Sequence, residues 1–167
     1  MKTLNDRVKE GQQLQQAINN LNKSYYRRQS RLKKRLEQML EQEHTYFITF
    51  TIAPKNYGLK YNTYLRKIKE ALITASDWIL NSDYGDTNGR LHFHCVASFK
   101  AQLDYTILNN IYKYGAIDIM TIYNKNEKAI REYLNKTLNH ALKQTAGKIY
   151  YSRQKRVKSQ VKNSLTE

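Results

Sequence analysis

The spacing of hydrophobic positions changes along this chain, and it predicts which elements form. Residues 3 to 42 contain one glycine and no proline, and their apolar side chains recur at helical intervals. This pattern predicts a long amphipathic helix that could break near Gly11. Three roles stay open for it: packing on the following domain, pairing with another copy, or ordering only on DNA.

After residue 43, short alternating runs typical of strands are interleaved with helical patterns. The expected strands are His44–Ala53, Trp78–Tyr84, Arg90–Phe99, Ala116–Tyr123 and Lys148–Ser152. The expected helices are Tyr61–Ala75, Leu103–Tyr114 and Glu127–Lys143. A glycine-containing hairpin joins the second and third strands. This order predicts an α+β fold class, with a mostly antiparallel five-stranded sheet covered by helices and an N-terminal helical extension.

The length of the chain limits its domain organisation. A chain of 167 residues can bury one core, but it is too short for a catalytic domain plus a helicase domain. We divide it into a basic amphipathic helical extension (1–43), a main domain (44–153) and a basic flexible tail (154–167). The sequence lacks a Gly-x-x-x-x-Gly-Lys-Ser/Thr loop, so no nucleotide cofactor is expected.

The charge of the chain indicates its partner. There are 29 Lys and Arg against 14 Asp and Glu, and the net charge of +15 should attract polyanions such as nucleic acid. The basic residues concentrate in 21–36 and 133–166, where tyrosines interleaved with them could stack on unpaired bases. The alternative is that these runs are solvated surface. The one cysteine, Cys95, cannot form an internal disulfide, and no apolar run is long enough for a membrane, so we expect a reduced compartment and no membrane.

The most informative motif is His92-Phe93-His94, which lies within a predicted strand. Because side chains alternate across a strand, both imidazoles should share one face while Phe93 points into the opposite one. Two neighbouring imidazoles provide half of a divalent metal site. The alternative is one exposed histidine and one satisfied core histidine.

A second motif lies on the predicted helix Glu127–Lys143. Tyr133, Lys136 and His140 follow one another at steps of three and four, so they should line one flank of this helix. A tyrosine and a lysine near a metal-binding pair suggest phosphoryl transfer, in which the phenolate attacks phosphorus. Alternatively, Tyr133 packs at the core margin and Lys136 is merely solvated.

Together these motifs resemble the HUH endonucleases, and within them the single-tyrosine rolling-circle replication initiators of small phages and plasmids. His92-Phe93-His94 matches their His-hydrophobic-His motif, and Tyr133-Leu134-Asn135-Lys136 matches their Tyr-x-x-Lys motif. Asp83 stands where similar initiators carry an acidic metal ligand, usually Glu. The run Phe47–Thr51 looks like their first motif, and the similarity extends over about residues 45–155.

The resemblance implies a ferredoxin-like (RRM-like) fold for the main domain and a site that binds Mg²⁺ or Mn²⁺. The implied metal ligands are His92, His94 and Asp83, with Asp86 as the alternative acid. Tyr133 would be the nucleophile and Lys136 would assist it. The implied activity is nicking and rejoining of single-stranded origin DNA through a 5′-phosphotyrosyl link, with a free 3′-OH for replication.

Further expectations follow from the basic runs together with the resemblance. The residues expected to contact DNA are Arg27, Arg28, Arg31, Lys34, Thr49, Thr51, Arg90, Lys148, Arg153, Lys155 and Arg156. A host helicase and polymerase would be partners, and the expected location is the cytoplasm of a bacterial host cell. Two alternatives remain: a transposase or relaxase of the same superfamily, or a non-catalytic regulatory protein that binds single-stranded nucleic acid.

Overall fold

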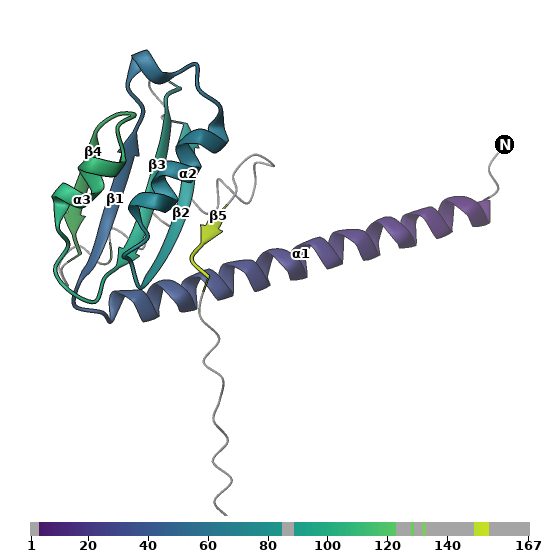
Figure 1. Cartoon of the computed structure of the whole chain (residues 1–167). Coiled ribbons are helices and arrows are strands. Elements are labelled where there is room, and N and C mark those ends of the chain that lie inside the picture. Colours follow the sequence, from purple (N-terminus) through teal and green to yellow (C-terminus); the bar gives the residue numbers. More distant parts are fainter. Residues whose placement is uncertain (1–3, 85–88, 123–127, 129–131, 133–148, 154–167) are drawn as a thin grey trace, which may run out of the picture.

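The structure, a computed structural model, describes residues 4–84, 89–122, 128, 132 and 149–153 (Figure 1). The predicted helix Glu127–Lys143 lies outside these residues except at Lys128 and Glu132, which are helical. The tail expected at 154–167 also lies outside them.

The centre of the fold is an antiparallel five-stranded sheet. Its strands are β1 (Thr45–Thr51), β2 (Asp77–Tyr84), β3 (Leu91–Ser98), β4 (Ile117–Thr121) and β5 (Ile149–Tyr151). They are hydrogen-bonded in the order β4-β1-β3-β2-β5, and every neighbouring pair is antiparallel. The first four strands and the two helices between them follow the βαββαβ order of ferredoxin-like folds, and β5 adds an edge strand. The predicted α+β fold class is confirmed.

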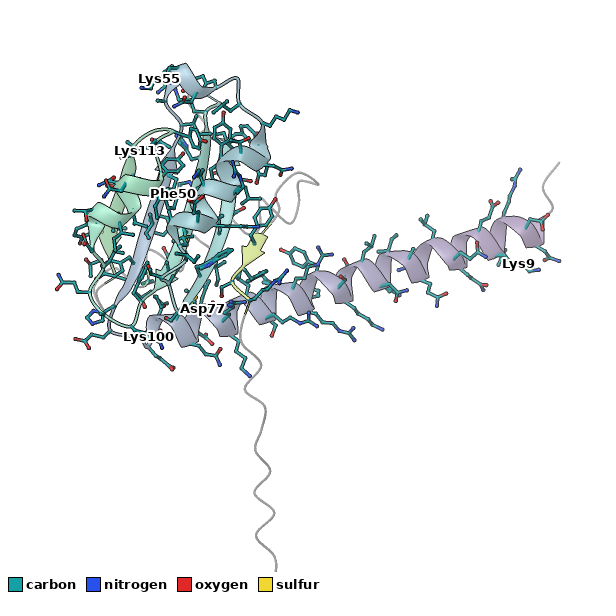
Figure 2. All side chains as sticks on the ribbon, viewed as in Figure 1. Lys9, Phe50, Lys55, Asp77, Lys100 and Lys113 are labelled. Atoms are coloured by element: carbon teal, nitrogen blue, oxygen red, sulfur yellow. The ribbon has the colours of Figure 1, made fainter. Side chains whose placement is uncertain are left out.

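Two helices cover one face of this sheet, and the main core lies beneath them (Figure 1). The helical elements are α1 (Leu4–Leu40), η1 (Pro54–Asn56), α2 (Tyr61–Ala71) and α3 (Tyr105–Ile111). Alternate strand residues point into the layer under α2 and α3, as a period of two requires. Phe50, labelled in Figure 2, is fully buried there together with Leu80 and Phe93, and these side chains cluster with Ile68 of α2 and Leu108 of α3.

The N-terminal helix is continuous over its 37 residues, so the break considered near Gly11 does not occur. Most of α1 projects away from the sheet (Figure 1), and Leu14, Ile18 and Leu21 on this part are exposed. A Cβ added at Gly11 would meet no atom of the described residues within 4 Å. Among the described residues, no helix is both long enough and apolar enough to cross a membrane.

The last turns of α1 pack on the sheet face opposite α2 and α3. Leu32, Leu36 and Met39 form a second buried cluster with Ile79 of β2 and Val96 of β3. Of the three roles considered for this helix, packing on the main domain is therefore the one that its C-terminal end fulfils.

A hydrogen-bonded ion pair reinforces this docking. Arg35 of α1 donates from Nε to Asp77 Oδ2 at 3.1 Å and also pairs with Asp77 Oδ1. The same guanidinium donates to the Ser152 carbonyl oxygen at 3.1 Å, just beyond β5. Asp77 is labelled in Figure 2, where β2 meets α1. Because an Arg–carboxylate pair of this kind fixes geometry as well as charge, Arg35 ties α1 to the edge of the sheet.

Replacing Met39 with alanine should lower the free energy of unfolding by about 2–5 kcal/mol, because this fully buried side chain fills the contact between α1 and the sheet. Urea denaturation followed by the fluorescence of Trp78, the chain's one tryptophan, measures the change. Leu14→Ala is the matched control; Leu14 is 64% exposed, so we expect a change within about 0.5 kcal/mol. Equal effects of the two variants would contradict the docking of α1.

Candidate functional site

The two histidines of β3 lie on the sheet face opposite the main core. Between them, Phe93 is fully buried against α2, with its ring centroid 5.5 Å from that of Tyr61. Cys95 follows the same alternation and is buried on Phe93's face. The predicted register of this strand is therefore confirmed: His92 and His94 share one face and Phe93 points into the other.

Antiparallel pairing places polar residues of the neighbouring strands beside both histidines. His92 stands opposite Asp83 of β2 and Thr51 of β1. His94 stands opposite Asn81 of β2 and Thr49 of β1. The Cβ atoms of directly opposed residues lie about 4.5–5.5 Å apart, so each histidine is the centre of a cross-strand row of three side chains.

His94 occupies the more enclosed of the two rows. It is 8% exposed, its ring is stacked on Phe47 with centroids 5.8 Å apart, and its Nδ1 lies 3.2 Å from Thr49 Oγ1. Burial lowers the pKa of His94 from 6.5 to about 4; the charge of Asp83 opposes this shift and His92 reinforces it. The imidazole is therefore neutral at neutral pH, which is the form that binds metals.

Asn81 is a residue of this face that the sequence did not single out. It is 6% exposed, and its Oδ1 is buried without a hydrogen-bond partner among the residues that the structure describes. A buried carbonyl oxygen in that state is costly unless a donor or a cation supplies the missing interaction. Its position directly opposite His94 makes that oxygen part of the candidate site. No sequence signal distinguishes Asn81 until the register of β2 is known.

The chemistry of this face fits a divalent cation, although the ligands do not form a closed set. His92 and His94 have ring centroids 6.2 Å apart, and Asp83 is half-buried beside His92. In the described part of the chain, no three His, Cys, Asp or Glu side chains converge closely enough to hold a metal ion. Asp118 of β4, which pairs with Thr49, adds a second acid to this face, and it is exposed. The alternative ligand Asp86 lies outside the described residues.

The predicted DNA-binding threonines hold structural positions in this sheet. Thr51 Oγ1 donates to the Ala116 carbonyl oxygen and accepts from the Ala116 N–H, both at 3.1 Å. These bonds depend on a close approach of two backbones, because a Cβ on Gly115 would lie 2.0 Å from the Thr51 carbonyl oxygen. Thr49 lies against His94 and so belongs to the histidine rows.

The other predicted site residues fall into two groups. The predicted site residues that are exposed cations within the described part are Arg27, Arg28, Arg31, Lys34, Arg90 and Arg153. The residues that lie outside the described part are Tyr133, Lys136, Lys148, Lys155 and Arg156. Four cations of the first group lie on α1, and Arg90 and Arg153 lie next to strands of the sheet.

No protein-family model matches this chain, and no curated protein matches it. Among solved structures, it is similar to the crystal structure of the hypothetical protein ORF119 from Sulfolobus islandicus rod-shaped virus 1, at 23% identity and a TM-score of 0.44. The match covers 64% of this chain and 92% of that chain. A likeness of this size carries no information about activity.

Without metal, the free energy of unfolding should decrease as the pH is lowered from about 6.5 to about 4. In this window the unfolded chain protonates His94, whereas the folded chain, with the pKa of His94 lowered to about 4, does not. The expected loss is up to about 3 kcal/mol. Urea denaturation in the presence of a chelator measures it, and His94→Gln should remove this part of the pH dependence. The same pH dependence in both proteins would show that His94 is not the group responsible.

Proposed function

We propose that this protein is an HUH-type endonuclease that nicks and rejoins single-stranded origin DNA, initiating rolling-circle replication of a phage or plasmid. The observation that carries the proposal is the sheet face on which Asp83 pairs with His92 and His94 follows two residues later. Two imidazoles and a carboxylate on one rigid surface are the donor set that the resemblance to HUH endonucleases requires.

The residues of this face suit the metal that the proposal needs. His92, His94 and Asp83 would hold Mg²⁺ or Mn²⁺, and the buried Asn81 oxygen adds a hard donor to the same surface. When bound, such an ion withdraws negative charge from the scissile phosphate. His94 supports binding because its lowered pKa, about 4, keeps the imidazole neutral.

The chemical step is assigned to the predicted tyrosine motif. The Tyr133 phenol loses its proton and its oxygen attacks phosphorus in line, which breaks the bond to the 3′ oxygen. That oxygen leaves and takes up a proton, giving a free 3′-OH and a 5′-phosphotyrosyl link. Lys136, three residues after Tyr133 in the sequence, favours the phenolate by its positive charge. Attack by a second 3′-OH reverses the step, and because the phosphodiester energy is conserved no ATP is needed.

Binding of the DNA strand is assigned to the charge of the chain. A net charge of +15 and exposed cations on α1 and beside the sheet suit a polyanion. A host helicase would expose the strand and a host polymerase would extend the 3′-OH, which locates the protein in the cytoplasm of a bacterial host.

The second candidate function is non-catalytic binding of single-stranded nucleic acid. The observation in its favour is that no three potential metal-binding side chains converge among residues 4–84, 89–122, 128, 132 and 149–153. The two candidates differ in one product, a covalent protein–DNA adduct that survives denaturation.

Tyr133→Phe should abolish that adduct, because only the nucleophilic oxygen is lost. Affinity for single-stranded DNA should stay within roughly tenfold, the most that a hydroxyl hydrogen bond of about 0.5–1.5 kcal/mol can contribute. Incubation with oligonucleotides from the surrounding genetic element, Mg²⁺ or Mn²⁺, and denaturing electrophoresis measures the adduct. Tyr123→Phe is the control, and it should keep the adduct. An adduct at wild-type level in Tyr133→Phe would remove Tyr133 as the nucleophile.

His92→Ala should lower the rate of metal-dependent cleavage by more than about 100-fold, since residues that merely support metal ligands already contribute 10- to 100-fold. His44→Ala is the matched control, because His44 precedes β1 and its carbonyl oxygen accepts a hydrogen bond from the Phe99 N–H, beyond the end of β3 opposite to His92. Single-turnover cleavage against metal concentration measures both. Equal rates in the two variants would mean that His92 holds no catalytic metal.

A further inference from the structure

A pocket of about 420 Å³ lies where β2 ends and β3 begins, on the face opposite the histidines. Its walls come from the end of the sheet, the segment after η1, and α2. Lys55, labelled in Figure 2, marks the η1 turn at this end of the domain. The residues that line it include Tyr57, Leu59, Tyr61, Tyr84, Arg90 and Leu91. The volume is in the range of pockets that hold small organic groups.

Large hydrophobic side chains at this pocket are left in water. Tyr57 is 46% exposed, Leu59 42% and Tyr84 59%. Exposed apolar groups are unremarkable singly, but several around one hollow mark a binding site. Tyr61 also lines the pocket, and its hydroxyl donates to Ser82 Oγ at 3.1 Å.

The charge of the residues around this pocket favours a ligand that carries negative charge. Among the described residues that line it, none is acidic and Arg90 is exposed at its edge. An aromatic hollow beside a cation, in a protein of net charge +15, suits a flat ring attached to a phosphate chain. A nucleobase has that form, since its face stacks on tyrosine and its phosphate is attracted to arginine.

The pocket is joined to the histidine face through the strands themselves. Tyr84 follows Asp83 directly in β2, and Leu91 directly precedes His92 in β3. Because neighbouring strand residues point to opposite faces, Tyr84 and Leu91 face the pocket while Asp83 and His92 face the other side. A single strand that passes around this end of the sheet would therefore meet both surfaces.

We propose that this pocket binds an unpaired base of a single-stranded nucleic acid, next to the phosphate held at the histidine face. The inference rests on the proposed single-strand binding and adds a base-binding subsite to it. Enclosing a base in the pocket would fix which phosphate of the strand reaches Asp83 and His92, so this subsite would set the position of the nick.

The test is equilibrium binding by fluorescence anisotropy, with a labelled short oligothymidylate and an abasic oligomer of the same length and charge. Wild-type protein should prefer the oligothymidylate by roughly 5- to 150-fold, the value of stacking one base. Tyr84→Ala and Tyr57→Ala should shrink this preference several-fold and leave affinity for the abasic oligomer unchanged. Tyr84→Phe should retain the preference, because the ring is kept.

Tyr105→Ala is the matched control, since Tyr105 is 45% exposed on α3 and does not line the pocket. Equal wild-type affinity for both oligomers, or an equal effect of Tyr105→Ala and Tyr84→Ala, would overturn the base pocket while leaving strand binding in place. Failure to bind either oligomer would instead overturn the proposed function. Displacement of the oligothymidylate by free thymidine monophosphate at micromolar concentration would overturn the assignment to a base within a strand.

Discussion

The alternation of side chains along β3 is the constraint on which the site depends. Phe93 is fully buried in the main core, and this fixes His92 and His94 on the opposite face. A shift of one residue would move the aromatic ring into the polar rows and both imidazoles into the apolar core. Burying two imidazoles without partners costs several kcal/mol, so packing of one phenylalanine sets the position of both candidate ligands.

Periodicity was enough to predict the sheet, the shared face of the histidines and the α+β order, because each depends on local patterns. The start of α3 depended on a side-chain hydrogen bond that a pattern does not contain. The helix expected from Leu103 begins at Tyr105, because the Asp104 carboxylate accepts a hydrogen bond from the Thr106 N–H at 2.9 Å and caps it.

The members of the site that sequence reasoning missed come from cross-strand neighbours. Asn81 and Asp118 are ordinary polar residues of their strands, and only the pairing of β2 with β3 and of β1 with β4 brings them to the histidine face. Arg35, by contrast, is a residue whose charge suggested DNA binding but whose role in the fold is structural. It lies in a basic run that charge alone assigns to DNA, yet its guanidinium binds Asp77 and the Ser152 carbonyl within the fold.

The docking of α1 at one end of the histidine face divides that face by its polarity. Val96 lies in the apolar contact under α1, His94 is nearly enclosed, and His92, furthest from α1, is half-buried. The effective dielectric constant therefore rises from Val96 towards His92. A charge near His94 therefore acts on its neighbours more strongly than the same charge near His92. Coulomb interactions on this face are strongest beneath α1 and weaken towards His92.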